Sequence, residues 1–276
     1  MRSDCQDTKA GAGINRLLTV LVCLLPLFGV AEEANSDGGW RRVVQLRFPE
    51  ALREFRDDVH TRDAQAQLGE AISLLNRPPR TQRNLEAARI ILGELKKSGD
   101  ADLAAAATYH LARYFHVVPY HRDPRAAEIH YRELLDRHPH HFYGQLAISK
   151  LALLRLYETP IGEDRGKILG ELELLAGALR NPAAKRSFHK VMANGYLRFE
   201  VSREKALSHL LTAVDAGFVE GSAEAQSMVQ IIELAVLLRR DKMARDFTER
   251  FLARYPRDQR AAYLANRFNL VPPPMR

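Results

Sequence analysis

The chain has 276 residues and a net charge of +7 at neutral pH; 46% of its residues are apolar and 27% are charged. This composition is typical of a globular protein with a substantial core, so it excludes a disordered or low-complexity chain. Both cysteines, Cys5 and Cys23, lie close to the amino terminus. The remainder of the chain therefore has no residue for a disulfide, a thiol nucleophile or a thiolate metal site.

Residues 1–31 have the pattern of an export signal. A weakly basic start precedes the apolar run 17–31, which is short for a membrane span and is interrupted by Pro26. The run ends in the small residues that signal peptidase prefers, so we expect cleavage after Ala31 and a periplasmic or secreted protein. The segment carries three basic and two acidic residues, so its removal lowers the net charge from +7 to +6.

Two other fates of this segment remain open. The first is an uncleaved inner-membrane anchor through residues 17–31, because the polar stretch before Leu17 is long for a signal. The second is lipid attachment at Cys23, which is disfavoured because Val22, rather than a small residue, precedes it. Of the cleaved signal and the uncleaved anchor, only the anchor would give the protein a contact with the membrane.

Residues 32–63 are predicted to form a flexible lead and a short helix. The stretch 32–39 is small and polar, which favours a flexible chain. Apolar and basic residues alternate from Trp40 to Phe55, and Pro49 is suited to the first turn of a helix.

From residue 64 onward, apolar residues recur at steps of three and four, which predicts helices rather than strands. Turn residues divide this region into units of roughly 35 to 40 residues. We place helix pairs at 64–98, 102–138, 141–181, 185–217 and 220–255, with a last helix at 258–268 and a tail at 269–276.

One spacing occurs twice in this region. Alanine, a second residue four positions later and a proline eight positions after that appear as Ala127, Tyr131 and Pro139, and again at 244, 248 and 256. The alanine lets two helices approach closely, and the proline stops the second helix so that the next can turn back. The repeated spacing predicts stacked helical hairpins across residues 64–268.

These units resemble the tetratricopeptide repeat (TPR) family. The best match is Met192–Leu197 followed by Glu204–Ala206, Leu210 and Ala213; a second unit matches at Leu111-Ala112, Phe115, Ala127, Tyr131, Leu134 and Pro139, and a third begins at Tyr143, Leu146 and Ala147. The resemblance implies an all-α, right-handed α-solenoid of about five hairpins with a carboxy-terminal capping helix. The helix at 163–180 departs from the family pattern because it has Gly170 and a leucine-rich face.

Within that family, the helix endings Arg-His-Pro and Arg-Tyr-Pro-Arg-Asp look most like periplasmic proteins of envelope assembly and the tol-pal system. The resemblance implies a non-enzymatic protein-interaction scaffold that holds a peptide or partner protein in a concave groove. It also implies which residues look into that groove. The predicted partner-binding residues are Tyr109, Arg113, His116, Lys190, Asn194 and Arg198. Their cations favour an acidic partner.

The alternative function is a metal- or ligand-binding envelope protein that uses the histidine-rich hairpin 110–141. Its histidines are His110, His116, His121, His130, His138, His140 and His141. A metal site needs three or four such groups to converge, and the simpler interpretation, which we favour, is that they are polar turn and surface residues. No hydrolase, phosphate-loop, dinucleotide or metalloprotease motif occurs, so we expect no enzyme activity, no cofactor and no nucleic-acid partner.

Overall fold

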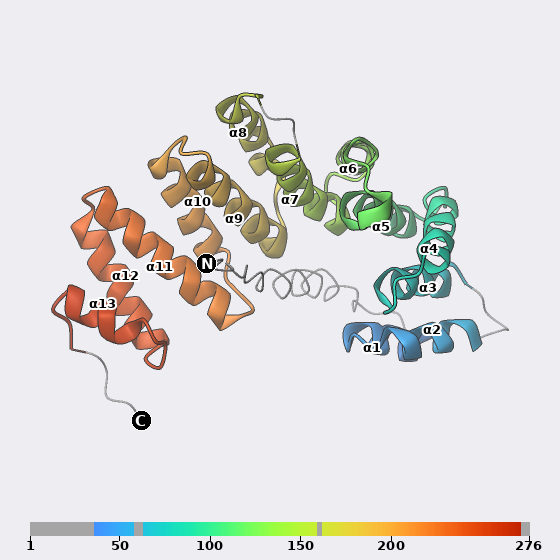
Figure 1. Cartoon of the computed structure of the whole chain (residues 1–276), viewed down its shortest axis with the longest axis horizontal. Coiled ribbons are helices and arrows are strands. Elements are labelled where there is room, and N and C mark those ends of the chain that lie inside the picture. The colour runs from blue at the N-terminus through green and yellow to red at the C-terminus, as the bar shows by residue number, and fades with distance from the viewer. Residues whose placement is uncertain (1–35, 58–62, 159–161, 272–276) are drawn as a thin grey trace, which may run out of the picture. The chain divides into compact units, whose positions relative to one another are not determined.

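The computed structural model describes residues 36–57, 63–158 and 162–271. These ranges contain thirteen α-helices and two short 3-10 helices, and none of their residues lies in a strand (Figure 1). The prediction of an all-helical chain is therefore confirmed. The predicted signal at 1–31, with its cleavage after Ala31, lies outside the described residues. In the ranges that are described, no helix combines the length and the apolar character needed to cross a bilayer.

The chain divides into two compact units, 1–91 and 92–276. The division falls within α4 (Gln82–Leu95), the second helix of the first predicted pair. The two units are described separately below.

The first unit contains α1 (Ser36–Val44), α2 (Phe48–Asp57) and α3 (Ala64–Asn76), and each of these three helices packs against the other two. The ring of Phe55 is buried among them, 5.4 Å from the ring of Trp40 in an edge-to-face contact. At the edge of this core, Arg56 donates a 2.8 Å hydrogen bond to the buried carboxylate of Glu70.

Helix α1 corrects the prediction of a flexible lead at 32–39, because four of those residues are helical from Ser36 onward. Two glycines weaken helix propensity here, but they allow close packing. A Cβ atom at Gly39 would lie 2.5 Å from the Phe55 ring, so only glycine lets this helix approach α2 so closely. The contact joins Gly39 to Phe55 of another helix, so the local sequence pattern could not predict α1.

The second unit contains α5 to α13. The helices are α5 (Ala101–Val117), α6 (Pro124–Arg137), α7 (Phe142–Tyr157), α8 (Arg165–Glu173), α9 (Pro182–Arg198), α10 (Arg203–Asp215), α11 (Gly221–Leu237), α12 (Asp241–Arg254) and α13 (Ala261–Arg267). Short 3-10 helices follow α5 at Pro119–His121 and α8 at Leu174–Ala178. Successive helices of this unit pack as neighbours, so the helix pairs expected at 102–138, 185–217 and 220–255 are present with bounds that differ by a few residues. In the pair expected at 141–181, α7 packs against α9 as well as α8.

The repeated sequence spacing corresponds to two matching helices, α6 and α12. Both have 14 residues, and the alanine of the spacing is the fourth residue of each. The residue after each helix has nearly the same backbone, with φ −134° and ψ 48° at His138 and φ −128° and ψ 54° at Tyr255. The following proline disfavours the helical conformation at both positions, so the same residue type ends both helices in the same way.

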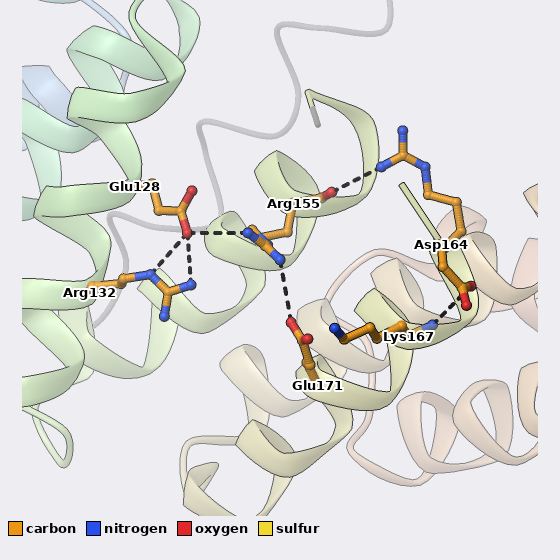
Figure 2. Close-up of polar contacts among 7 residues, drawn as sticks. Glu128, Arg132, Arg155, Asp164, Lys167 and Glu171 are labelled. Carbon is orange, nitrogen blue, oxygen red and sulfur yellow. Dashed lines mark hydrogen bonds and ion pairs between the residues drawn. The ribbon is translucent and has the colours of Figure 1, made fainter. Parts of the chain in front are cut away.

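A chain of polar contacts joins α6, α7 and α8 at the unit's surface (Figure 2). Arg155 of α7 lies 3.7 Å from the carboxylate of Glu128 on α6 and 3.3 Å from that of Glu171 on α8. Arg132 holds the same Glu128 from its own helix, with an N–O distance of 2.7 Å. These groups are partly exposed, so each pair contributes at most about 1 kcal/mol. The chain of contacts orients α8, the helix that departs from the family pattern.

Candidate functional site

The candidate site lies on α9, whose start and end are well defined. The side chain of Asn181 caps its first turn by accepting from the backbone N–H groups of residues 183 and 184, and Pro182 occupies the first helical position. At the other end, Glu200 adopts a left-handed conformation with φ 54°, and the N–H of Val201 donates to the carbonyl of Tyr196. The helix therefore holds its side chains in fixed directions.

One face of α9 is buried and another is open. Phe188, Met192, Ala193 and Tyr196 are at most 2% exposed and pack into the core. Asn194 and Arg198 are exposed, and Lys190 is half-buried. All three predicted residues of this helix therefore reach its surface at steps of four.

Lys190 is held in place by an aromatic ring. Its ammonium lies 5.3 Å from the centre of the Phe218 ring, and the guanidinium of Arg186 lies 5.6 Å from the same ring. Arg186 also donates a hydrogen bond to the carbonyl of Gly217. Two cations are thus positioned around one ring, each within the distance at which cations are attracted to aromatic faces.

The electrostatics of this pair favour an anion. Burial lowers the pKa of the Lys190 ammonium, the nearby Arg186 lowers it further, and Glu220 acts in the opposite direction. Burial also lowers the pKa of Arg186. Both shifts mean that the two positive charges are incompletely solvated, which costs free energy. A carboxylate placed between them would offset this desolvation cost through charge-assisted hydrogen bonds.

At the far end of α9, Arg198 lies close enough to Tyr157 for its charge to act on the phenol. Tyr157 is 43% exposed and packs against Phe199 with ring centres 5.8 Å apart. An aromatic side chain therefore accompanies the cation at this end as well. The twelve residue steps from residue 186 to residue 198 span about 18 Å along the helix.

The three residues predicted on α5 are placed differently. Tyr109 is 1% exposed and packs against Tyr143, with ring centres 5.2 Å apart. His116 is 9% exposed, and its Nδ1 lies 3.1 Å from the hydroxyl of Tyr131 on α6. Arg113 is half-buried. The structure therefore puts Tyr109 and His116 in helix packing instead of an open groove, and it does not extend the α9 face onto α5.

Arg186 belongs to the candidate site, although the sequence did not identify it. It precedes Lys190 by four residues, so the same spacing that selected the other positions would have found it. Its role depends on the ring of Phe218, which contacts both Arg186 and Lys190. Phe218 is distant from them in the sequence, so no local pattern could predict this contact. We call Arg186, Lys190, Asn194 and Arg198 the α9 stripe.

Two histidines of the hairpin 110–141 touch, since the rings of His138 and His141 lie edge to face with centres 6.3 Å apart. Burial lowers the pKa of His110 to about 3 and that of His116 to about 4, so both are neutral packing residues at pH 7. His130 accepts a 3.2 Å hydrogen bond from Lys96, and His141 caps α7 while contacting Asp102 at 3.0 Å. Across the described residues, no three His, Cys, Asp or Glu side chains gather as a metal ion requires.

A scan against models of protein families and a search of curated proteins each find no match. The resemblance to TPR proteins therefore rests on the spacing in the sequence. The matching ends of α6 and α12 are consistent with that spacing.

Proposed function

We propose that this protein is a non-enzymatic, TPR-like scaffold of the cell envelope that holds an acidic segment of a partner protein along α9. The observation that carries the proposal is the placement of Lys190 and Arg186 around Phe218, with Asn194 and Arg198 continuing along the same helix. Cations that are already oriented lose little side-chain entropy when a partner binds.

The composition of the stripe sets the chemistry of the partner. Arg186, Lys190 and Arg198 supply charge-assisted hydrogen bonds to carboxylates, and the amide of Asn194 can both donate and accept. An extended or helical peptide with carboxylates at its surface would match a stripe of about 18 Å. The net charge of +6 that remains after cleavage favours encounter with such a partner.

The location of the protein is part of the proposal. The pattern at residues 1–31 supports export, with cleavage after Ala31 and function in the periplasm or outside the cell. The all-helical hairpins support a repeat scaffold. Envelope assembly, as in the tol-pal-like proteins that the helix endings resemble, is the process we propose for it.

A charge-reversal experiment tests the role of the stripe. We expect Lys190→Glu combined with Arg198→Glu to keep the helical circular dichroism and to abolish co-purification of the partner that crosslinks to the wild-type protein. The matched control is Arg203→Glu with Lys242→Glu, which changes the charge equally at exposed positions of α10 and α12. Partner capture that is equal in the stripe variant and the wild type would refute the proposal.

A further inference from the structure

Two histidines meet at the buried interface of α9 and α10. The Nδ1 atoms of His189 and His209 are 2.7 Å apart, and the two residues are only 9% and 8% exposed. This distance requires a hydrogen bond, so one Nδ1 carries a proton and the other offers a lone pair. The pair is buried and fixed, and the proposed binding stripe does not use it.

Glu173 at the end of α8 determines which ring donates. Its carboxylate lies 3.5 Å from Nε2 of His209, which favours a proton on that nitrogen. Nδ1 of His209 then holds the lone pair and accepts from the Nδ1–H of His189. The side chains form a directed chain, from His189 to His209 to Glu173.

The other titratable groups near the pair come from the same elements. Tyr196 of α9 stacks on the His209 ring with centres 5.5 Å apart, and its hydroxyl donates to Glu173. Lys205 of α10 also donates to Glu173, at 3.1 Å, and Lys185 of α9 acts on His189 by its charge. Helices α7 and α11 also pack against this hairpin, and no charged group of theirs is among those that shift the described pair.

The geometry does not suit a metal. Two imidazole nitrogens that bind one zinc ion lie about 3.3 Å apart, because each Zn–N bond is about 2.0 Å and the angle is tetrahedral. The observed 2.7 Å is too short for this arrangement, and the carboxylate faces the other nitrogen of His209. A shared proton is the chemistry that fits.

We propose that His189 and His209 form an acid-operated latch between α9 and α10. A first added proton can enter at Nε2 of His189 and leave the hydrogen bond intact. A second can enter only at Nδ1 of His209, where it removes the acceptor and places two cations in contact. Acidification therefore favours the separated hairpin, in which water solvates both rings.

The size of the effect follows from linkage. Burial lowers the pKa of His189 to about 4, whereas an exposed histidine titrates near 6.5. Because the pKa is lowered only in the closed form, the open form takes up a proton at a higher pH than the closed form does. Acidification below pH 6.5 therefore shifts the equilibrium toward the open form. Between pH 7 and pH 5, His189 alone increases opening about twentyfold. Burial also lowers the pKa of His209, although Glu173 opposes that shift, so the second ring adds to the effect.

Opening of the latch would disturb the α9 stripe, because Lys190 directly follows His189 in the chain. That consequence rests on the proposed function, whereas the latch itself does not. The test below uses the protein without a partner, so failure of the latch and failure of the proposed function give different results.

Hydrogen exchange, corrected for the intrinsic pH dependence of the rate, tests the latch. From pH 7 to pH 5 we expect protection in α9 and α10 to fall at least tenfold more than in α11 and α12, whose residues 221–254 include no histidine. An equal loss in both hairpins, or no loss in either, would overturn the proposal.

A double variant supplies the control. Asparagine at 189 can keep the donated hydrogen bond and glutamine at 209 can keep the contact to Glu173, so His189→Asn with His209→Gln removes the proton sites with little loss of bonding. We expect its α9–α10 protection to depend on pH no more than that of α11–α12, and a loss equal to the wild type's would overturn the latch. If the variant does not fold, titration of the wild-type imidazoles by NMR decides: a pKa of 6.5 or above for both rings contradicts the latch, and a lower pKa for His189 supports it.

Discussion

At some positions in this protein, a neighbouring backbone atom leaves no space for any side chain. Gly144, near the start of α7, is the clearest example, because a Cβ atom there would lie 2.0 Å from the carbonyl oxygen of His138. Backbone cannot move aside as a flexible side chain can. By contrast, Gly170 in α8 has no heavy atom within 4 Å of the position of a Cβ.

These two glycines give opposite predictions. We expect Gly144→Ala to lower the free energy of unfolding by about 3 kcal/mol or more, because the added methyl group overpacks a fixed contact. Gly170→Ala should raise it by about 0.5 to 1 kcal/mol, because alanine is the better residue in a helix interior. Urea unfolding of the two variants measures both effects, and equal values for the two would contradict the described approach of α7 to His138.

Three residues other than glycine that follow helices in the described part of the second unit have positive φ, namely Glu200, Arg239 and Asn269. Glu200 after α9 has φ 54°, and Arg239 after α11 has φ 55°. The left-handed conformation costs a side-chain-bearing residue about 1 kcal/mol or more, and glycine avoids this cost. We expect Glu200→Gly and Arg239→Gly each to stabilise the protein by about 0.5 to 1 kcal/mol in thermal melts. Gln226→Gly, at an exposed position inside α11, should destabilise it by about 1 kcal/mol, and the same sign at all three positions would contradict the assigned helix ends.

At the scale of helices, close crossings depend on small residues. Ala127 of α6 and Ala206 of α10 are both 0% exposed, in helices that pack against α5 and α9 respectively. We expect a change of either to leucine to lower the free energy of unfolding by about 1 to 3 kcal/mol, because the added atoms have no free space. Ala253→Leu, at an exposed position of α12, should have little effect. Equal, negligible losses at all three positions in denaturant melts would show that the register of the pairs is wrong.

The sequence predicted helices best where their ends are encoded locally. Pro139 and Pro256 act on the residue before them, so α6 and α12 end where the spacing indicated. Helix α1 was missed because its stability depends on the contact between Gly39 and Phe55, which no local pattern contains. The same limit applies to the candidate site.

Periodicity identified which residues of α9 share a face, and Lys190, Asn194 and Arg198 do reach the surface. It could not show which face of α5 is covered, because that depends on α6 and α7. Tyr109 and His116 therefore lie in the core, with Tyr143 and Tyr131 as their contacts. The contact between Lys190 and the Phe218 ring could not be predicted from the sequence either, because Phe218 follows the next helix, α10.

For the whole molecule, the histidines predict sensitivity to acid. Burial lowers the pKa of His110 to about 3 and those of His116 and His189 to about 4. The folded protein keeps these rings neutral, whereas the unfolded chain takes up protons near pH 6.5. Stability is therefore fully present above pH 6.5 and is lost as the pH falls toward 4.

The slope of this loss can be measured. Each of the three histidines contributes about 1.4 kcal/mol per pH unit between pH 6 and pH 4.5, so unfolding near pH 5 should take up about three protons from these rings. Burial also lowers the pKa values of His130 and His209, which add to that number. Urea melts at several pH values give that number. We expect His116→Gln to reduce it by about one, and a stability that does not change between pH 7 and pH 5 would contradict the described burial of these rings.

The central claim is that a partner protein binds along α9, and crosslinking from the stripe tests it most directly. A photoreactive amino acid in place of Asn194 should crosslink one partner in living cells, and an acidic segment of that partner should carry the crosslink. The same group in place of the exposed Ser208 on α10 should not capture it. Crosslinking of the same partner from Ser208 but not from Asn194 would contradict the account.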